Sequence, residues 1–176
     1  MPDDASLAPP LVDGPTAAAR PVGPAIEARR TVAVAPDALF AFLADLENHW
    51  AIAARFVRVV RLEGPPGAHD GSVLRVAGPL GLHRTTRARI VETVDGRSIV
   101  GIARVGRRTA ARVAWRLDPG PDGGGTAVTL RADVLRASPG DRLLLALGGR
   151  WWLRRGFAAA LRSLADACQN PADGPR

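Results

Sequence analysis

Hydrophobic and polar residues alternate along much of the chain between positions 26 and 136, with the two-residue period of β-strands. In one segment, for example, Val113, Trp115 and Leu117 share a face, and two arginines and an alanine lie on the other. The pattern predicts strands at residues 26–34, 55–64, 72–78, 83–94, 97–106, 109–118 and 125–136. We expect a sheet with one apolar face and one polar face.

The segments between these strands are rich in turn-forming residues. Residues 94–97, VDGR, contain the Asp-Gly pair of a tight hairpin, and residues 118–125, DPGPDGGG, suit a looser turn. Short connections favour antiparallel pairing of neighbouring strands. The chain therefore predicts an antiparallel meander.

The segment after the first strand, residues 34–50 with the sequence VAPDALFAFLADLENHW, is predicted to be helical and unusually apolar. Leu39, Leu43, Leu46 and Trp50 recur at spacings of four, three and four, which places them on one helix face. Because so apolar a face must be buried, we expect this segment to form an end wall of an internal cavity.

The last element predicted is a long helix over residues 138–169. Ser138 and Pro139 have the residue types of an N-cap and a first helical position. Its inward stripe is predicted to consist of Leu153, Phe157, Leu161, Leu164 and Cys168. Gly148 and Gly149 predict a bend or a close approach, since each glycine costs roughly 1 kcal/mol relative to alanine inside a helix.

The strand-to-helix segment VAPDALFAFLADLENHWAIAARF at residues 34–56 and the final helix resemble the SRPBCC superfamily, also called START-like or birch-pollen-allergen-like. Within it the chain is most similar to the polyketide cyclase/dehydrase type, over about residues 26–169. The resemblance implies an α+β helix-grip fold, with two short helices after the first strand. In that fold a curved antiparallel sheet of six or seven strands wraps around the C-terminal helix and leaves a hydrophobic cavity.

The ends of the chain are predicted to lie outside this domain. Residues 1–25 are rich in Pro and Ala and are expected to form a disordered leader, and residues 170–176 a short tail. The chain carries no apolar run long enough for a signal peptide or a membrane-spanning helix. Its only cysteine, Cys168, can form no internal disulfide, so we expect a soluble, cytoplasmic protein.

Composition argues against several other classes of function. The net charge is +7 and every basic residue is arginine, but the arginines are scattered and no aromatic-basic platform accompanies them, so nucleic-acid binding is not expected. His49, His69 and His83 lack metal-ligand spacing. We expect no metal and no cofactor, and the sequence leaves the oligomeric state open.

The inward positions of the predicted elements indicate an apolar binding site. A curved sheet closed by one helix is not filled completely by that helix, so a pocket suited to a lipid, a polyketide or an aromatic molecule is expected. The residues predicted to contact such a ligand are Leu43, Trp50, Phe56, Ile90, Val113, Trp115, Leu130, Trp151 and Phe157. Trp115 suits ordinary core packing equally well.

Only two residues stand out as candidates for catalysis. His49 either acts as an acid or base at the cavity mouth or stabilises the turn around it. Arg84 shares a strand face with Thr86 and Ile90, and either pairs with an anionic group of a ligand or reaches solvent.

Three functions remain open on the sequence alone. The leading hypothesis is a binding protein or carrier for a small hydrophobic molecule, because the inner face is apolar and lacks a recognisable catalytic group. The competing hypothesis is a cyclase or dehydrase that uses His49 or Arg84. A third is a module that docks on anionic membranes through the tryptophans and arginines of residues 150–155, although Trp151 could instead pack into the cavity.

Overall fold

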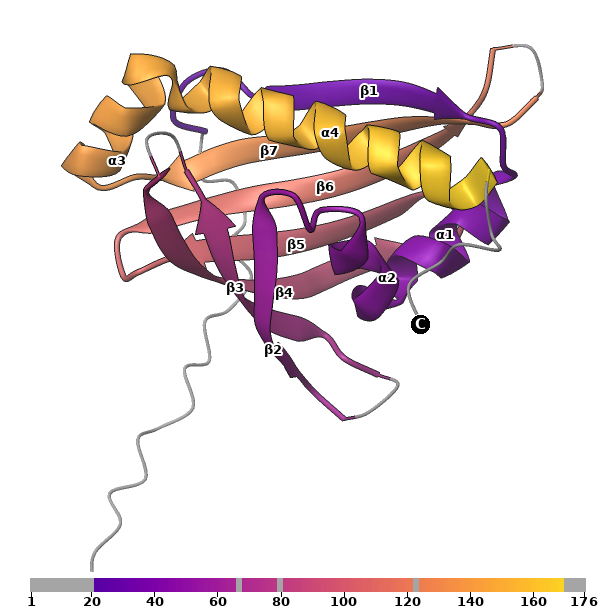
Figure 1. Cartoon of the computed structure of the whole chain (residues 1–176), viewed down its shortest axis with the longest axis horizontal. Coiled ribbons are helices and arrows are strands. Elements are labelled where there is room, and N and C mark those ends of the chain that lie inside the picture. Colours follow the sequence, from indigo (N-terminus) through magenta and orange to yellow (C-terminus); the bar gives the residue numbers. More distant parts are fainter. Residues whose placement is uncertain (1–20, 66–67, 79–80, 122–123, 170–176) are drawn as a thin grey trace, which may run out of the picture.

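The computed structural model describes residues 21–65, 68–78, 81–121 and 124–169, which form a curved antiparallel sheet and a long C-terminal helix (Figure 1). The seven strands are β1 (Ile26–Val32), β2 (Val57–Glu63), β3 (Gly71–Ala77), β4 (His83–Val94), β5 (Ser98–Val105), β6 (Thr109–Pro119) and β7 (Thr126–Arg136). The helical elements are α1 (Pro36–Ala44), α2 (Leu46–Ala51), α3 (Pro139–Leu144), the π-helical turn η2 (Leu145–Gly149) and α4 (Arg150–Gln169). The predicted helix-grip architecture is confirmed.

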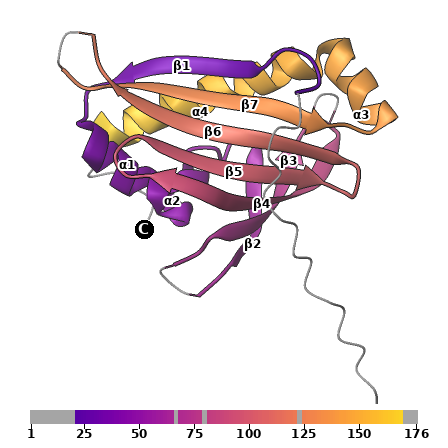
Figure 2. The same cartoon turned by 180° about the vertical axis from the view of Figure 1, so that it is seen from behind.

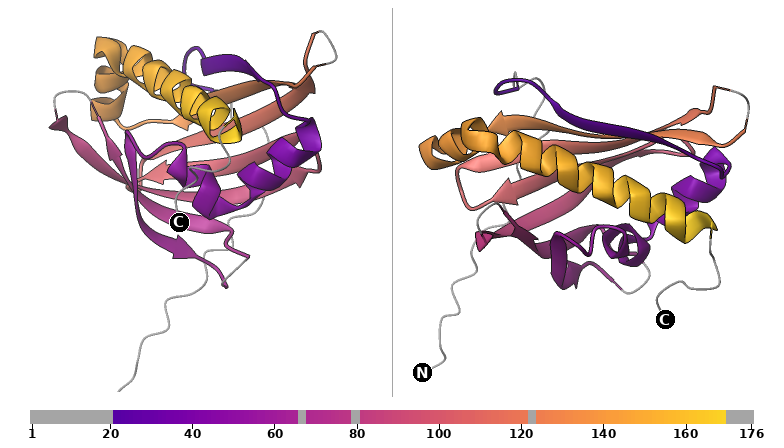
Figure 3. Two further views of the ribbon diagram at one scale, coloured as in Figure 1. Left: turned by 45° about the vertical axis from the view of Figure 1, so that its right-hand side comes forward. Right: turned by 45° about the horizontal axis from the view of Figure 1, so that its top comes forward.

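The strands follow the order β1-β7-β6-β5-β4-β3-β2, so that β2 to β7 form a meander and β1 adds to its β7 edge. Irregularities in the strand register occur between Val59 and Arg61, between Ile90 and Glu92, and between Ala110 and Ala111. Such bulges bend a strand and increase its twist. The sheet accordingly curves around α4 (Figure 3).

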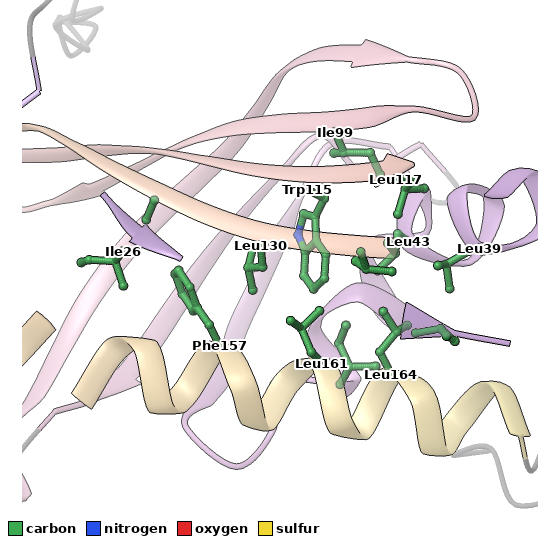
Figure 4. Packing of buried hydrophobic residues seen from close by; sticks show 14 of the residues in the cluster. Ile26, Leu39, Leu43, Ile99, Trp115, Leu117, Leu130, Phe157, Leu161 and Leu164 are labelled. Carbon is green, nitrogen blue, oxygen red and sulfur yellow. The ribbon is translucent and has the colours of Figure 1, made fainter. Parts of the chain in front are cut away.

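Helix α4 covers the concave face of the sheet, and the opposite face carries no helix in the described part of the chain (Figure 2). Figure 4 shows Trp115 and Leu130 of the sheet directed at Phe157 and Leu161 of α4. These four side chains are buried. Alternation along β7 predicts one shared face for Thr126, Val128, Leu130, Ala132 and Val134, and all five are buried. The apolar face of the sheet is therefore the concave one.

The apolar segment after β1 forms two short helices at one end of the sheet, which confirms what the family resemblance implied (Figure 1). The spacing of apolar residues alone suggested one continuous face. The chain turns at Asp45, whose extended backbone ends α1 and whose carboxylate accepts a hydrogen bond from the backbone N–H of Glu47 at 2.8 Å. This N-cap starts α2 in a new direction. Leu43 from α1 and Leu46 and His49 from α2 are consequently all buried.

The bend predicted in the C-terminal helix is present at η2. Leu147 and Gly148 depart from helical geometry, and Gly148 has a φ of +107°. A Cβ on Gly149 would lie 2.7 Å from the carbonyl oxygen of Leu144. One glycine is therefore required for its backbone conformation and the other for close approach.

The predicted leader lies mostly outside the described residues, as does the predicted tail at 170–176. Its last five residues, 21–25, are described and contact the domain. The backbone N–H of Val22 donates to the carbonyl oxygen of Val134 at 2.6 Å, and the guanidinium of Arg150 donates to the carbonyl oxygen of Val22 at 2.8 Å. The described chain is thus attached to the domain a few residues before β1.

Candidate ligand-binding cavity

A cavity of about 330 Å³, partly open to solvent, lies between the concave face of the sheet and the helices. Side chains from β3 to β7, α2 and α4 line it, and most of them are apolar. The volume and the apolar lining are typical of sites for small molecules. The space expected between sheet and helix is therefore present.

Seven of the nine side chains predicted to contact a ligand line this cavity. They are Trp50, Phe56, Ile90, Val113, Trp115, Leu130 and Phe157. The structure places the other two elsewhere: Leu43 is fully buried in the core, and Trp151 is 64% exposed to solvent. Contact between the seven and a ligand stays a prediction.

The helix side of the cavity differs from the prediction because of the rotation of α4. Residues in a helix advance by about 100° each, so Trp151 lies about 200° around the axis from Leu153, which lines the cavity. Trp152 lines it instead and packs edge to face against Phe56, with ring centroids 6.3 Å apart. The inward stripe predicted from the sequence already contained Leu153 and Phe157 of this face, and Trp151 does not share their spacing.

His49 is buried beside the cavity, with both ring nitrogens bonded to protein atoms. Nδ1 lies 3.1 Å from the carbonyl oxygen of Leu43, and Nε2 lies 3.2 Å from the indole Nε1 of Trp115. A carbonyl only accepts and an indole N–H only donates, so the ring must be neutral, with its proton on Nδ1. Burial lowers the pKa of His49 to about 4, against an opposing contribution from the bond to Leu43. The geometry favours the structural role over that of a free base.

Arg84 lines the cavity where α3 meets the start of β4. The anionic group that pairs with it belongs to the protein. Its guanidinium lies 3.1 Å from a carboxylate oxygen of Asp141 on α3. Burial raises the pKa of Asp141, but hydrogen bonds from Thr109 and Ser138 and the charge of Arg84 outweigh it, so the pKa is lowered overall. Both alternatives for Arg84 are therefore replaced by a third: its guanidinium pairs with a carboxylate of the protein itself.

The remaining ionisable side chains that line the cavity are also paired. Asp70 and Arg89 form an exposed ion pair at 3.3 Å. Among the described residues, no three His, Cys, Asp or Glu side chains gather in a way that could hold a metal ion. Cys168 does not line the cavity, and burial raises the pKa of its thiol, which keeps it protonated. Each ionisable group that lines the cavity thus already has a protein partner.

Two neutral polar groups in the cavity wall differ in this respect. The indole Nε1 of Trp50 and the hydroxyl of Ser72 are buried without a hydrogen-bond partner in the described part of the chain, and Ser72 is only 1% exposed. Ser72, Leu74 and Val76 follow one another at every second position of β3, so their side chains lie on the same face. Leu74 and Val76 line the cavity, so the hydroxyl of Ser72 is on the concave face. A buried polar group without a partner is costly, so these two atoms are the ones a polar ligand atom would satisfy.

Comparison with known proteins gives a family match over most of the chain. The family model described as polyketide cyclase/dehydrase and lipid transport matches residues 24–169. No curated protein matches the chain. No helix in the described ranges has the length and apolar character needed to cross a bilayer.

Solved structures with the same fold share little sequence with this chain. TTHA0849 from Thermus thermophilus is 17% identical, with a TM-score of 0.61 over 85% of this chain and 100% of its own. The di-domain ARO/CYC StfQ from the steffimycin biosynthetic pathway is 22% identical, with a TM-score of 0.60 over 84% of this chain and 52% of StfQ. DynU16 from the dynemicin biosynthetic locus is 15% identical, with a TM-score of 0.55 over 84% of this chain and 48% of DynU16. At these identities the similarity shows a shared fold.

Proposed function

This chain belongs to the polyketide cyclase/dehydrase and lipid transport family, and on that premise we propose that it binds and carries a small hydrophobic molecule in the cavity. One observation carries the proposal: the wall is apolar, and the charged and titratable groups in it are already paired within the protein. Burial of apolar ligand surface would then supply most of the affinity, at about 25 cal/mol per Å². A cytoplasmic location fits the single cysteine.

The polar atoms of the wall narrow the class of ligand. Trp50 offers an N–H donor, and the hydroxyl of Ser72 can donate or accept. An oxygen on an otherwise apolar ligand would satisfy one or both of these groups. We therefore expect a lipid, polyketide or aromatic molecule that carries a carbonyl or hydroxyl oxygen, in preference to a pure hydrocarbon.

A cyclase or dehydrase activity is the second candidate. It is supported by the family description and by the same two groups, because an indole N–H and a hydroxyl directed at one carbonyl would stabilise the negative charge that develops on it. A proton-transfer step has weaker support. His49 would have to give up its bond from Trp115, and Arg84 would have to leave Asp141.

Native mass spectrometry of protein purified from its own host tests the carrier. The wild type should retain a hydrophobic molecule, and Val113→Trp, which fills space at the cavity wall, should lose it. Val91→Trp is the matched control, because Val91 is an exposed valine on strand β4 of the same sheet and does not line the cavity. Far-UV circular dichroism would check that both variants fold.

Either of two outcomes would contradict the carrier. In one, repeated preparations of the wild type contain no bound molecule and bind no anilinonaphthalene sulfonate, used as an apolar probe. In the other, Val113→Trp binds as well as Val91→Trp. Turnover of the retained molecule, lost in Ser72→Ala and unchanged in His49→Gln, would instead favour the second candidate.

A further inference from the structure

The C-terminal helical segment exposes three large apolar side chains to solvent. Leu143, Leu147 and Trp151 are 60%, 75% and 64% exposed and follow one another at intervals of four residues, from α3 across the bend at η2 to the start of α4. We call these three residues the outer stripe. Single exposed apolar residues are common on protein surfaces, but a regular series of them indicates a surface that binds something.

The charge along the outer stripe is positive. Between positions 142 and 165 the chain has five arginines and no acidic residue. Arg154 and Arg155 are exposed, and the guanidinium of Arg155 lies 5.4 Å from the ring centroid of Trp151. Tryptophan and leucine flanked by arginine suit the boundary between lipid headgroups and acyl chains. The chemistry that complements this face is therefore apolar and anionic at once.

The other side of the same segment belongs to the cavity. The cavity wall includes Leu144, Leu145 and Trp152. Each of them is one or two residues from a member of the outer stripe in the sequence. The segment bends between them at Gly148, and the ion pair of Asp141 with Arg84 ties its start to β4. A surface bound by the outer stripe would thus lie about one helix diameter, roughly 10 Å, from the cavity lining.

We propose that the outer stripe and its arginines dock onto an anionic lipid bilayer. Anionic lipid satisfies both features, since acyl chains take up the leucines and the indole while headgroups pair with Arg154 and Arg155. A second copy of this chain fits less well. A symmetric contact would place the same surface on both partners and bring their arginines together. Docking stands independently of the proposed cavity ligand, although it would place a bilayer beside the cavity.

Sedimentation with vesicles tests the proposal. We expect the wild type to bind vesicles of phosphatidylcholine with about 30% phosphatidylserine and to bind pure phosphatidylcholine far more weakly. Leu147→Ser combined with Trp151→Ala should weaken binding about tenfold or more, and so should Arg154→Gln combined with Arg155→Gln, because each arginine near an anionic surface contributes about fivefold. Raising the salt concentration should reduce binding of the wild type.

Matched controls separate docking from general attraction of a positive protein. Arg58→Gln with Arg75→Gln removes the same charge from exposed positions that pair in register on β2 and β3, and Val60→Ser removes an exposed apolar side chain on β2. Both controls should bind as the wild type does. Val113→Trp, which fills the cavity, should also still bind, so that a failure of ligand carriage is distinguished from a failure of docking.

Three results would overturn the proposal. In the first, the wild type fails to bind anionic vesicles, and in the second, the control variants lose as much affinity as the outer-stripe variants. In the third, light scattering shows a dimer of the wild type that Leu147→Ser with Trp151→Ala converts to a monomer, which would assign this face to a second copy. Circular dichroism spectra that match the wild type would confirm that each variant is folded.

Discussion

The indole Nε1 of Trp115 donates a hydrogen bond to Nε2 of His49 over 3.2 Å, which joins strand β6 to helix α2 inside the core. The other ring nitrogen donates to the carbonyl oxygen of Leu43, just before the turn between α1 and α2. His49 therefore holds both short helices against the sheet. The side chain that most suggested acid-base chemistry is fully engaged in structure.

This arrangement predicts a pH dependence of stability. The pKa of His49 is about 4 in the folded protein and about 6.5 when unfolded, so between these values the unfolded chain binds more protons. Stability should fall as the pH drops from 6.5 toward 4, by on the order of 3 kcal/mol in total, with about 2 kcal/mol lost by about pH 5. Urea unfolding of the wild type at about pH 7.5 and about pH 5 measures this change.

His49→Gln isolates the contribution of the imidazole. The Gln side chain can still accept from Trp115 but does not titrate. The variant should be less stable than the wild type at about pH 7.5, and the difference should shrink by about 2 kcal/mol at about pH 5. Parallel losses of stability in the two proteins would show that the pKa of His49 is the same in the folded and the unfolded chain.

Removing an unpartnered polar group from the cavity wall should affect stability and ligand binding in opposite directions. Ser72→Ala removes a buried hydroxyl without a partner in the described ranges, so the free energy of unfolding should stay the same or rise by up to about 1 kcal/mol. Affinity for the molecule retained in native preparations should fall about fivefold to tenfold, which corresponds to one hydrogen bond. Calorimetric titration and urea unfolding of the same variant measure the two quantities.

Two further variants test that interpretation. Trp50→Phe should weaken ligand binding to a similar extent or more, because it removes the indole donor and part of the apolar surface at a cavity-lining position. Ser98→Ala, at the start of β5 and outside the cavity, should leave the affinity unchanged. A Ser72→Ala protein that binds as tightly as the wild type would show that the ligand makes no use of this hydroxyl.

The sheet could be predicted from the sequence because its order is local. Each strand is recognised from the alternation of apolar and polar residues within it. The same two-residue period gives the inward faces of β6 and β7. Trp115 was therefore correctly placed on the inner face. Its partner His49 lies 66 residues away in the sequence, and no local pattern connects them.

Two short helices after β1 and a bend in the last helix were expected, but the directions that the helices take after each turn could not be predicted. Asp45 ends α1 and starts α2 by a capping hydrogen bond, although apolar spacing alone extends across it. The bend at Gly148 separates α3 from α4, so the outward position of Trp151 depends on the phase of α4 alone. The pairing of Arg84 with Asp141 likewise requires the path of the chain between β7 and α4.

Asp141 is expected to stabilise the start of the C-terminal segment. Its carboxylate accepts from the hydroxyl of Ser138 at 2.7 Å and from Thr109, and it pairs with Arg84. Asp141→Asn removes the charge but keeps the shape, and should lower the free energy of unfolding by about 1–2 kcal/mol. Asp133→Asn is the comparison, because the carboxylate of Asp133 is about as exposed as that of Asp141 but is bonded to one side chain, Arg131, two residues away, and its loss should cost less than about 1 kcal/mol. Equal losses would show that the network around α3 adds nothing beyond a surface ion pair.

The bend in the C-terminal segment predicts opposite responses from two glycines. A Cβ would meet no atom within 4 Å at either Gly140 or Gly148, so space does not distinguish them. Gly148 has a φ of +107°, which a side chain rarely adopts, whereas Gly140 lies in α3 without a positive φ. Gly148→Ala should therefore lower the free energy of unfolding by about 1–2 kcal/mol, and Gly140→Ala should leave it unchanged or raise it by up to about 1 kcal/mol. Thermal and urea unfolding of the two variants would measure the contrast. A Gly148→Ala protein as stable as Gly140→Ala would mean that the segment passes from α3 into α4 as one regular helix, without the bend.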